Sequence, residues 1–158
     1  MQPAKPSEIK ALLILYNALL VGQILFLAIT SVLIFSGNFS TDSSLGKYLI
    51  EIIIVCIVIG LAGYFAGASL LRKRLEQLNN SPKSLMEKLN DYRGISITRW
   101  ALSEFATLFS IIMAFVTGSP ALLVIAIFLI ALFLTTRPSL SKAASDLNVS
   151  EMEINQMD

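Results

Sequence analysis

The amino-acid sequence predicts an all-α membrane protein, a four-transmembrane-helix bundle made of two antiparallel hairpins. Its 158 residues are 55% hydrophobic and 15% charged, with a mean hydropathy of +0.73, whereas soluble domains carry about 25% charged residues. Charge is also unevenly placed. Three long stretches lack any charged residue, and they lie between Lys10 and Asp42, between Glu51 and Arg72, and between Glu104 and Arg137.

The predicted membrane spans are residues 11–36, 48–71, 97–117 and 119–136. Each approaches the roughly 20 apolar residues that a helix needs to cross a hydrocarbon core. The last two spans come from one apolar block, divided by the turn Thr117-Gly118-Ser119-Pro120, where glycine relaxes the backbone and proline suits a first helical turn. The first span is too long for the apolar core of a signal peptide, so we expect it to remain as a helix.

The basic residues predict the orientation. All but one of the 12 Lys and Arg residues lie in the N-terminal tail, the central loop with its flanks, or the C-terminal tail, and only Lys47 lies on the other side. The positive-inside rule therefore predicts cytoplasmic N- and C-termini, and we expect the bacterial inner (plasma) membrane. An even number of spans also requires both ends on one side.

The central loop, residues 72–96, is predicted to be cytoplasmic and helical. Apolar residues recur at helical spacing past Leu71, so we expect the second span to continue beyond the membrane. A new short helix is expected to start with Ser81 as N-cap and Pro82 as first residue, and to end at Gly94. Two interpretations stay open: a docking surface for a partner, or an amphipathic connector that rests on the headgroups.

The C-terminal tail, residues 137–158, is predicted to be short and partly helical. Ser139 or Ser141 could cap one helix, and Ser150 and Glu153 have the spacing of a capping box. The tail is too small to form a domain, so the whole chain, residues 1–158, is predicted to be a single membrane domain.

Glu104 is the candidate ion-binding residue. It lies five residues inside Arg99, roughly 7 Å beyond the basic edge of the third span. A carboxylate there costs about 2.5–3.5 kcal/mol on insertion scales, so we expect it to face protein or water. Ser103 and Thr107 belong to a small, partly polar stripe beside it. These residues could bind a proton or cation, or Glu104 could make a structural hydrogen bond or ion pair.

Gly60, Gly63 and Gly67 are the candidate helix-packing residues. The Gly63-x-x-x-Gly67 spacing lets a second helix approach almost to backbone contact. We expect the partner to be the small stripe of the third span, with homodimerisation as the alternative. In the first span, Tyr16, Gln23 and Thr30 share a face at seven-residue spacing, which predicts either inter-helix hydrogen bonds or a polar path through the bundle.

Composition also argues against several classes of function. The chain has no histidine and a single cysteine, Cys56, so a zinc site, a haem site or a Ser/His/Asp triad lacks its residues. We therefore expect no cofactor, no metal and no enzyme activity. A net charge of +1, without basic clusters interleaved with aromatics, predicts no nucleic-acid partner. The expected partners are the lipid bilayer, other membrane proteins or a second copy.

Residues 57–117 resemble the c-type proteolipid hairpin of rotary ATP synthases. The resemblance rests on the glycine-rich helix around Gly60-Leu61-Ala62-Gly63, the polar loop Asn79-Asn80-Ser81-Pro82, and the helix that contains Ala101-Leu102-Ser103-Glu104. It implies that Glu104 carries a proton or sodium ion. The sequence departs from the family at Asn80-Ser81, where an Arg-Gln pair is expected, and in its first and fourth spans. Small multidrug transporters also combine four spans with one membrane glutamate, although theirs is in the first helix.

Two functional hypotheses follow. The first is an accessory or scaffold-type membrane protein whose central loop forms its cytoplasmic surface. The second is a transport-related bundle in which Glu104 binds a proton or cation between the second and third spans.

Overall fold

The computed structural model describes residues 8–37 and 45–155 and is all-α, as predicted. Four long helices come first in the chain, and two short ones follow. The elements are α1 (Glu8–Phe35), the 3-10 turn η1 (Leu45–Tyr48), α2 (Leu49–Asn79), α3 (Leu85–Thr117), α4 (Pro120–Leu134), α5 (Leu140–Leu147) and α6 (Glu151–Asn155).

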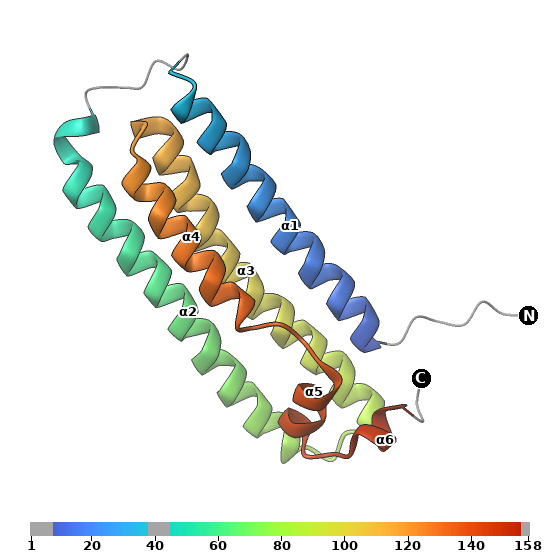
Figure 1. Cartoon of the computed structure of the whole chain (residues 1–158). Helices are drawn as coiled ribbons and strands as arrows, with labels where there is room; N and C mark the ends of the chain where they lie inside the picture. Colours follow the sequence, from blue (N-terminus) through green and yellow to red (C-terminus); the bar gives the residue numbers. More distant parts are fainter. Residues whose placement is uncertain (1–7, 38–44, 156–158) are drawn as a thin grey trace, which may run out of the picture.

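Helices α1 to α4 lie side by side in one bundle (Figure 1). Helices α1 and α3 run in one direction and α2 and α4 in the other. Helix α3 is central, because it packs against α1, α2 and α4. In its most apolar 18-residue window 39% of the residues are buried, whereas the corresponding windows of α1 and α2 are only 11% buried. Helices α1 and α2 therefore present most of their apolar surface outward.

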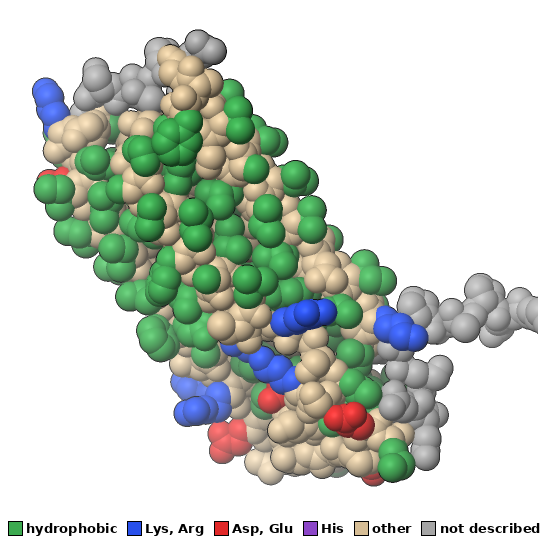
Figure 2. All heavy atoms as spheres, in the orientation of Figure 1, with side chains coloured by type: hydrophobic (Ala, Val, Ile, Leu, Met, Phe, Trp, Pro, Cys, Tyr) green, Lys and Arg blue, Asp and Glu red, His purple; other side chains and the backbone are tan. Residues whose placement is uncertain are grey.

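Three helices, α1, α2 (with η1) and α3, are long and apolar enough to cross a membrane, and α4 is a shorter apolar helix of 15 residues. Hydrophobic side chains cover most of the visible face of the bundle, and charged side chains gather at the end that carries α5 and α6 (Figure 2). We call this region, residues 72–96 and 137–155, the charged end. The distribution is consistent with a membrane helical bundle in contact with lipid.

The connection between α2 and α3 differs from the prediction. Helix α2 continues to Asn79, as expected, but Ser81 and Pro82 do not begin a helix. Ser84 is the N-cap instead: its Oγ accepts a hydrogen bond from the Glu87 amide at 3.4 Å, and its own amide donates to the Glu87 carboxylate at 2.9 Å. This reciprocal capping box satisfies two backbone donors at once, which fixes the start of the helix.

Gly94 does not end a helix either, because α3 runs through it without interruption. A glycine inside a helix costs only about 1 kcal/mol relative to alanine. Apolar packing on either side of Gly94, from buried Tyr92 and partly buried Ile95, offsets that cost. The predicted short helix and the predicted third span are therefore one helix of 33 residues.

The other helix ends agree with the sequence. Gly118 has φ 66°, the left-handed conformation that ends α3, and Pro120 is the first residue of α4. Ser139 caps α5 by accepting a hydrogen bond from the Lys142 amide at 3.2 Å. Before α6, the Ser150 amide donates to the Glu153 carboxylate at 2.7 Å.

The larger hydrophobic core lies towards the charged end. Helix α5 contributes three buried residues to it and α6 contributes one, so the tail is folded onto the ends of the long helices. The buried members are Leu12, Tyr16, Leu78, Leu89, Tyr92, Trp100, Phe133, Ala143, Ala144, Leu147 and Ile154. The C-terminal tail therefore closes one end of the bundle.

Candidate functional site

Ser103 and Thr107 are both buried, and each hydroxyl is satisfied within α3. The Ser103 hydroxyl donates to the Arg99 carbonyl at 3.3 Å, and the Thr107 hydroxyl donates to the Ser103 carbonyl at 3.2 Å. Such bonds to the carbonyl four residues earlier let a polar side chain face an apolar interior without a partner on another helix.

Around α3, Glu104 is offset by about 100° from Ser103 and by about 60° from Thr107. An α-helix turns by about 100° per residue, so Glu104 is about 40° from Trp100 and about 140° from Arg99. Trp100 contacts Tyr16 of α1, with ring centroids 5.4 Å apart, whereas Arg99 packs on Gly67 of α2. Glu104 is therefore nearer to α1 than to α2. Its side chain is half-buried and makes no hydrogen bond or ion pair with the part of the chain that the structure describes.

The three glycines of α2 lie against neighbouring helices of the same chain. A Cβ added at Gly63 would lie 3.0 Å from the Leu102 carbonyl oxygen of α3, and one added at Gly67 would lie 3.1 Å from Cγ of Arg99. At Gly60 the neighbour is Leu129 of α4, whose Cδ2 would be 2.6 Å away. Glycine is what allows α3 and α4 to approach α2 this closely.

The polar face of α1 points into the bundle. Tyr16, Gln23 and Thr30 are all at most 1% exposed. The Tyr16 hydroxyl donates to the Phe133 carbonyl of α4 at 3.1 Å, and the two rings stack with centroids 4.9 Å apart. Tyr16 thus forms one of the inter-helix hydrogen bonds that the sequence led us to consider.

Gln23 contrasts with Tyr16. Neither its amide nitrogen nor its amide oxygen has a hydrogen-bond partner among residues 8–37 and 45–155. Gln23 follows Tyr16 by seven residues and Thr107 follows Trp100 by seven, so Gln23 and Thr107 lie at about the same level of the bundle. An unpaired buried polar group costs about 1–3 kcal/mol. The interior therefore carries a polar group that packing alone does not explain.

Two polar contacts fasten α5 to the charged ends of α2 and α3. The Tyr92 hydroxyl donates to the Asp146 carboxylate at 3.1 Å, and the Asn79 side-chain amide donates to the Asp146 carbonyl at 3.0 Å. Burial, together with the charge and hydrogen bond of Asp146, raises the pKa of Tyr92 well above its ordinary value. The hydroxyl therefore stays protonated and remains a donor. No sequence pattern pairs Tyr92 with Asp146, because the two residues lie 54 positions apart.

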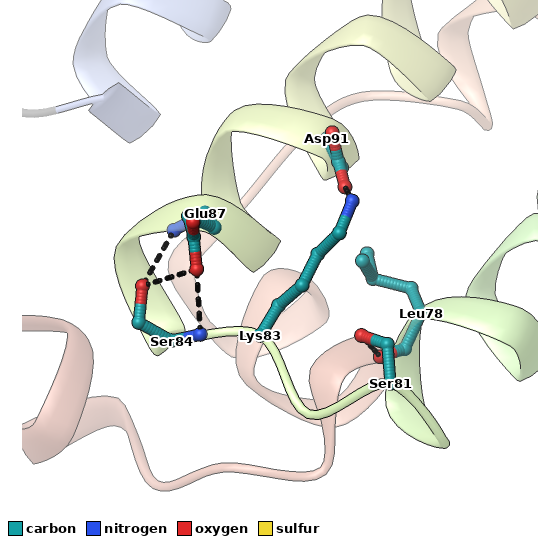
Figure 3. Close-up of polar contacts among 6 residues, drawn as sticks. All are labelled: Leu78, Ser81, Lys83, Ser84, Glu87 and Asp91. Atoms are coloured by element: carbon teal, nitrogen blue, oxygen red, sulfur yellow. Dashed lines mark hydrogen bonds and ion pairs between the residues drawn. The ribbon is translucent and has the colours of Figure 1, made fainter.

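The opposite face of the α2–α3 connection is open and forms a groove of about 480 Å³. Residues of both helices and the connecting loop line it, among them Leu70, Arg74, Lys83, Asp91, Gly94 and Thr98. Lys83 reaches from the loop to Asp91, with Nζ and Oδ2 2.6 Å apart, next to the Ser84–Glu87 cap (Figure 3). The hydrogen bond and charge of Asp91 raise the pKa of Lys83. Lys83 and Asp91 therefore close one end of the groove as an ion pair.

Within the described ranges, no three His, Cys, Asp or Glu side chains come together as metal ligands. The one cysteine, Cys56, is buried in α2. No protein-family model, curated protein or solved structure matches the chain. The resemblance of residues 57–117 to the c-type proteolipid hairpin therefore gains no support.

Proposed function

We propose that the protein is a four-span integral membrane protein of the accessory or scaffold type, with the charged end as its cytoplasmic surface. The observation that supports membrane insertion is the low burial of the apolar windows of α1 and α2, 11% in each. Ile50 is 71% exposed, Phe65 62% and Val124 65%. Each such side chain would forgo roughly 1.5–3 kcal/mol if it faced water, but loses nothing in lipid.

The fourth proposed span is shorter than the other three. Helix α4 has 15 residues, a length of about 22 Å, compared with a hydrocarbon core of roughly 30 Å. The turns at its two ends, residues 117–119 and 135–136, supply the remaining length. Their hydroxyls bond to nearby backbone: Thr117 donates to the Met113 carbonyl at 2.7 Å and Thr136 to the Phe133 carbonyl at 2.7 Å. These two hydroxyls are therefore satisfied by backbone at either end of α4.

The interior of the bundle favours the accessory hypothesis over a transport pathway. A pathway needs polar groups that converge on the ion, but the Ser103, Thr107 and Ser110 hydroxyls all donate to carbonyls of their own helix. Among the described residues, none of these hydroxyls donates to the Glu104 carboxylate. The structured polar surface lies at the charged end, which is where we expect a partner to bind.

Reporter fusions at Asp42 and Asn80 test the topology. We expect a reporter at Asp42 to be active only outside the cytoplasm and one at Asn80 only inside it, because one span separates the two positions. Active reporters of the same type at both positions would contradict the proposed arrangement.

Crosslinking from the charged end tests the accessory role. A photoreactive residue at exposed Gln77 or Met152 should crosslink to one defined membrane protein in intact cells, and the same residue at lipid-facing Ile14 should not. Equal labelling from all three positions would contradict a partner surface at this end.

A transport role for Glu104 is the second candidate, because a half-buried carboxylate without a described partner needs an explanation. Glu104→Gln keeps the shape and removes the titration, and Glu51→Gln, in the first turn of α2, is the control. Labelling of Glu104 by a hydrophobic carbodiimide, suppressed by sodium or high pH, would favour transport. Labelling insensitive to both, with unchanged physiology of E104Q, would exclude it.

A further inference from the structure

We propose that the groove between α2 and α3 at the charged end binds an anionic phosphate group, with a phospholipid headgroup as its source. This inference rests on the membrane placement proposed above. Four observations support it. They are the groove, the Arg74 guanidinium that lines it, the open space at Gly94, and the position of both residues relative to the predicted membrane spans.

The groove lies between the Gly67–Arg99 contact of α2 and α3 and the loop that joins the two helices. At Gly67 an added Cβ would lie 3.4 Å from the Arg99 carbonyl oxygen, so the two backbones are in contact there. Between this point and the loop, residues of both helices line the groove, and Lys83 and Asp91 close the loop end. The opposite face of the hairpin is occupied by α5 through Asp146. Among the described residues, the groove therefore lies on the face of the hairpin that α5 does not occupy.

Arg74 is the charged group available to that ligand. It lines the groove and makes no ion pair within the described residues, whereas Lys83 is already paired with Asp91. Since Lys83 offsets the Asp91 carboxylate, Arg74 leaves the groove with a net positive charge. A guanidinium has a planar fork of donors that matches phosphate oxygens, and such charge-assisted bonds are the stronger class.

Gly94 provides open space in the same groove as Arg74. It lines the groove from α3, and an added Cβ would meet nothing within 4 Å. A larger residue at this position would occupy the groove without disturbing the helix. Gly94, which was expected from the sequence to end a helix, therefore forms an open wall of the groove.

The positions of Arg74 and Gly94 relative to the membrane favour a lipid as the source of the phosphate group. Arg74 lies three residues beyond Leu71, the end of the predicted second span, and Gly94 lies three residues before Ile97, the start of the predicted third span. At 1.5 Å per residue both are about 4.5 Å outside the hydrocarbon core. The headgroup layer on each side is roughly 5–7 Å thick, so both residues fall within it. Leu70, which also lines the groove, offers an apolar contact to the start of an acyl chain.

Lipid binding to the full chain in detergent micelles, measured by native mass spectrometry, tests the proposal. The probes are phosphatidylglycerol, zwitterionic phosphatidylcholine and free glycerol phosphate. We expect phosphatidylglycerol to bind in preference to phosphatidylcholine. Arg74→Gln, which removes the charge, and Gly94→Leu, which fills the space, should each weaken its binding about tenfold or more.

The matched controls are Lys73→Gln and Gly22→Leu. Lys73 is the basic neighbour of Arg74 but does not line the groove, and Gly22 is an exposed helical glycine of α1 whose added Cβ also meets nothing. Both should keep wild-type binding. Equal binding of the two lipids, wild-type binding by R74Q and G94L, or an equal loss in K73Q would each overturn the proposal. Displacement of phosphatidylglycerol by glycerol phosphate at matched concentration would overturn the lipid source and keep the phosphate site.

Phosphatidylglycerol binding and topology are separate readouts. If the reporters at Asp42 and Asn80 place the charged end in the cytoplasm and the lipid does not bind, this inference fails alone. If the reporters contradict the topology, the proposed membrane placement fails regardless of lipid binding.

Discussion

The apolar half of the bundle and its charged end are held together by different contacts. In the apolar half, α2 meets α3 through glycine, and the α3 hydroxyls bond to their own helix. Towards the charged end, a larger hydrophobic cluster and cross-element hydrogen bonds such as Tyr92 to Asp146 join the helices. Lipid offers no hydrophobic drive for helices to associate, so close backbone packing takes its place. Where water surrounds the chain, burial of apolar side chains suffices.

The largest effect is expected where the two halves meet, at Trp100. Its ring packs against Tyr16 and its Nε1 donates to the Thr136 carbonyl at 3.3 Å. Trp100→Ala should lower the free energy of unfolding by about 3–5 kcal/mol, measured by SDS titration in mixed micelles. Phe105→Ala, at a 63% exposed position of α3, should have a much smaller effect. Equal losses would contradict the assignment of Trp100 to the core.

The next largest effect on stability is expected from the glycine packing in the apolar half. Gly63→Leu would push a side chain against the Leu102 carbonyl, so we expect a loss of about 1–3 kcal/mol in the free energy of unfolding. Gly22→Leu, at an open position, should leave stability close to wild type. The same SDS titration measures both, and tolerance of Gly63→Leu would show that α2 and α3 do not meet there.

Docking of the tail predicts a smaller and local effect. Tyr92→Phe removes one hydrogen bond to a carboxylate and should weaken docking of α5 by about 1.5 kcal/mol. Limited proteolysis of the C-terminal tail should become faster, whereas Tyr48→Phe, at an exposed position in η1, should leave it unchanged. The pKa of Tyr92 is raised in the fold, so its contribution is complete below pH of about 10 and declines above. Y92F should lack this alkaline decline.

The capping box of α3 predicts the smallest effect. Hydrogen bonds from the Ser84 side chain and backbone lower the pKa of Glu87. A lowered pKa stabilises the fold above the ordinary carboxyl value of about 4, and this contribution is lost as pH falls through the folded value. The thermal midpoint should therefore decline less steeply between pH 6 and pH 3 in Glu87→Gln than in wild type. Identical slopes would show that the cap is not formed in solution.

Much of the fold could be predicted because the apolar segments are long and the helix ends carry standard signals. The Gly118-Ser119-Pro120 turn and the Ser139 cap agree with the sequence. The predictions were wrong at Ser81, which was expected to start a helix, and at Gly94, which was expected to end one. At each position another feature of the chain outweighed the local signal. The Ser84–Glu87 box starts α3, and burial on both sides of Gly94 carries the helix through it.

The candidate sites were less predictable, because side-chain direction depends on how helices rotate in the bundle. The sequence associates Glu104 with Ser103 and Thr107, but around the helix it is about 100° from Ser103 and about 60° from Thr107, and neither hydroxyl donates to it. The Lys83–Asp91 pair and the Tyr92–Asp146 bond depend on how the loop and the tail fold back. Neither contact produces a periodic sequence pattern from which it could be predicted.

The contact between Tyr16 and Phe133 has a consequence for biosynthesis. The two residues are separated by 117 positions. At about 5–20 residues per second, a ribosome needs roughly 6–23 s to make the chain between them. During that time Tyr16 of the first helix lacks the Phe133 ring and carbonyl that it finally contacts. The nascent chain is therefore expected to need shielding by the insertion machinery until the last apolar helix has been delivered.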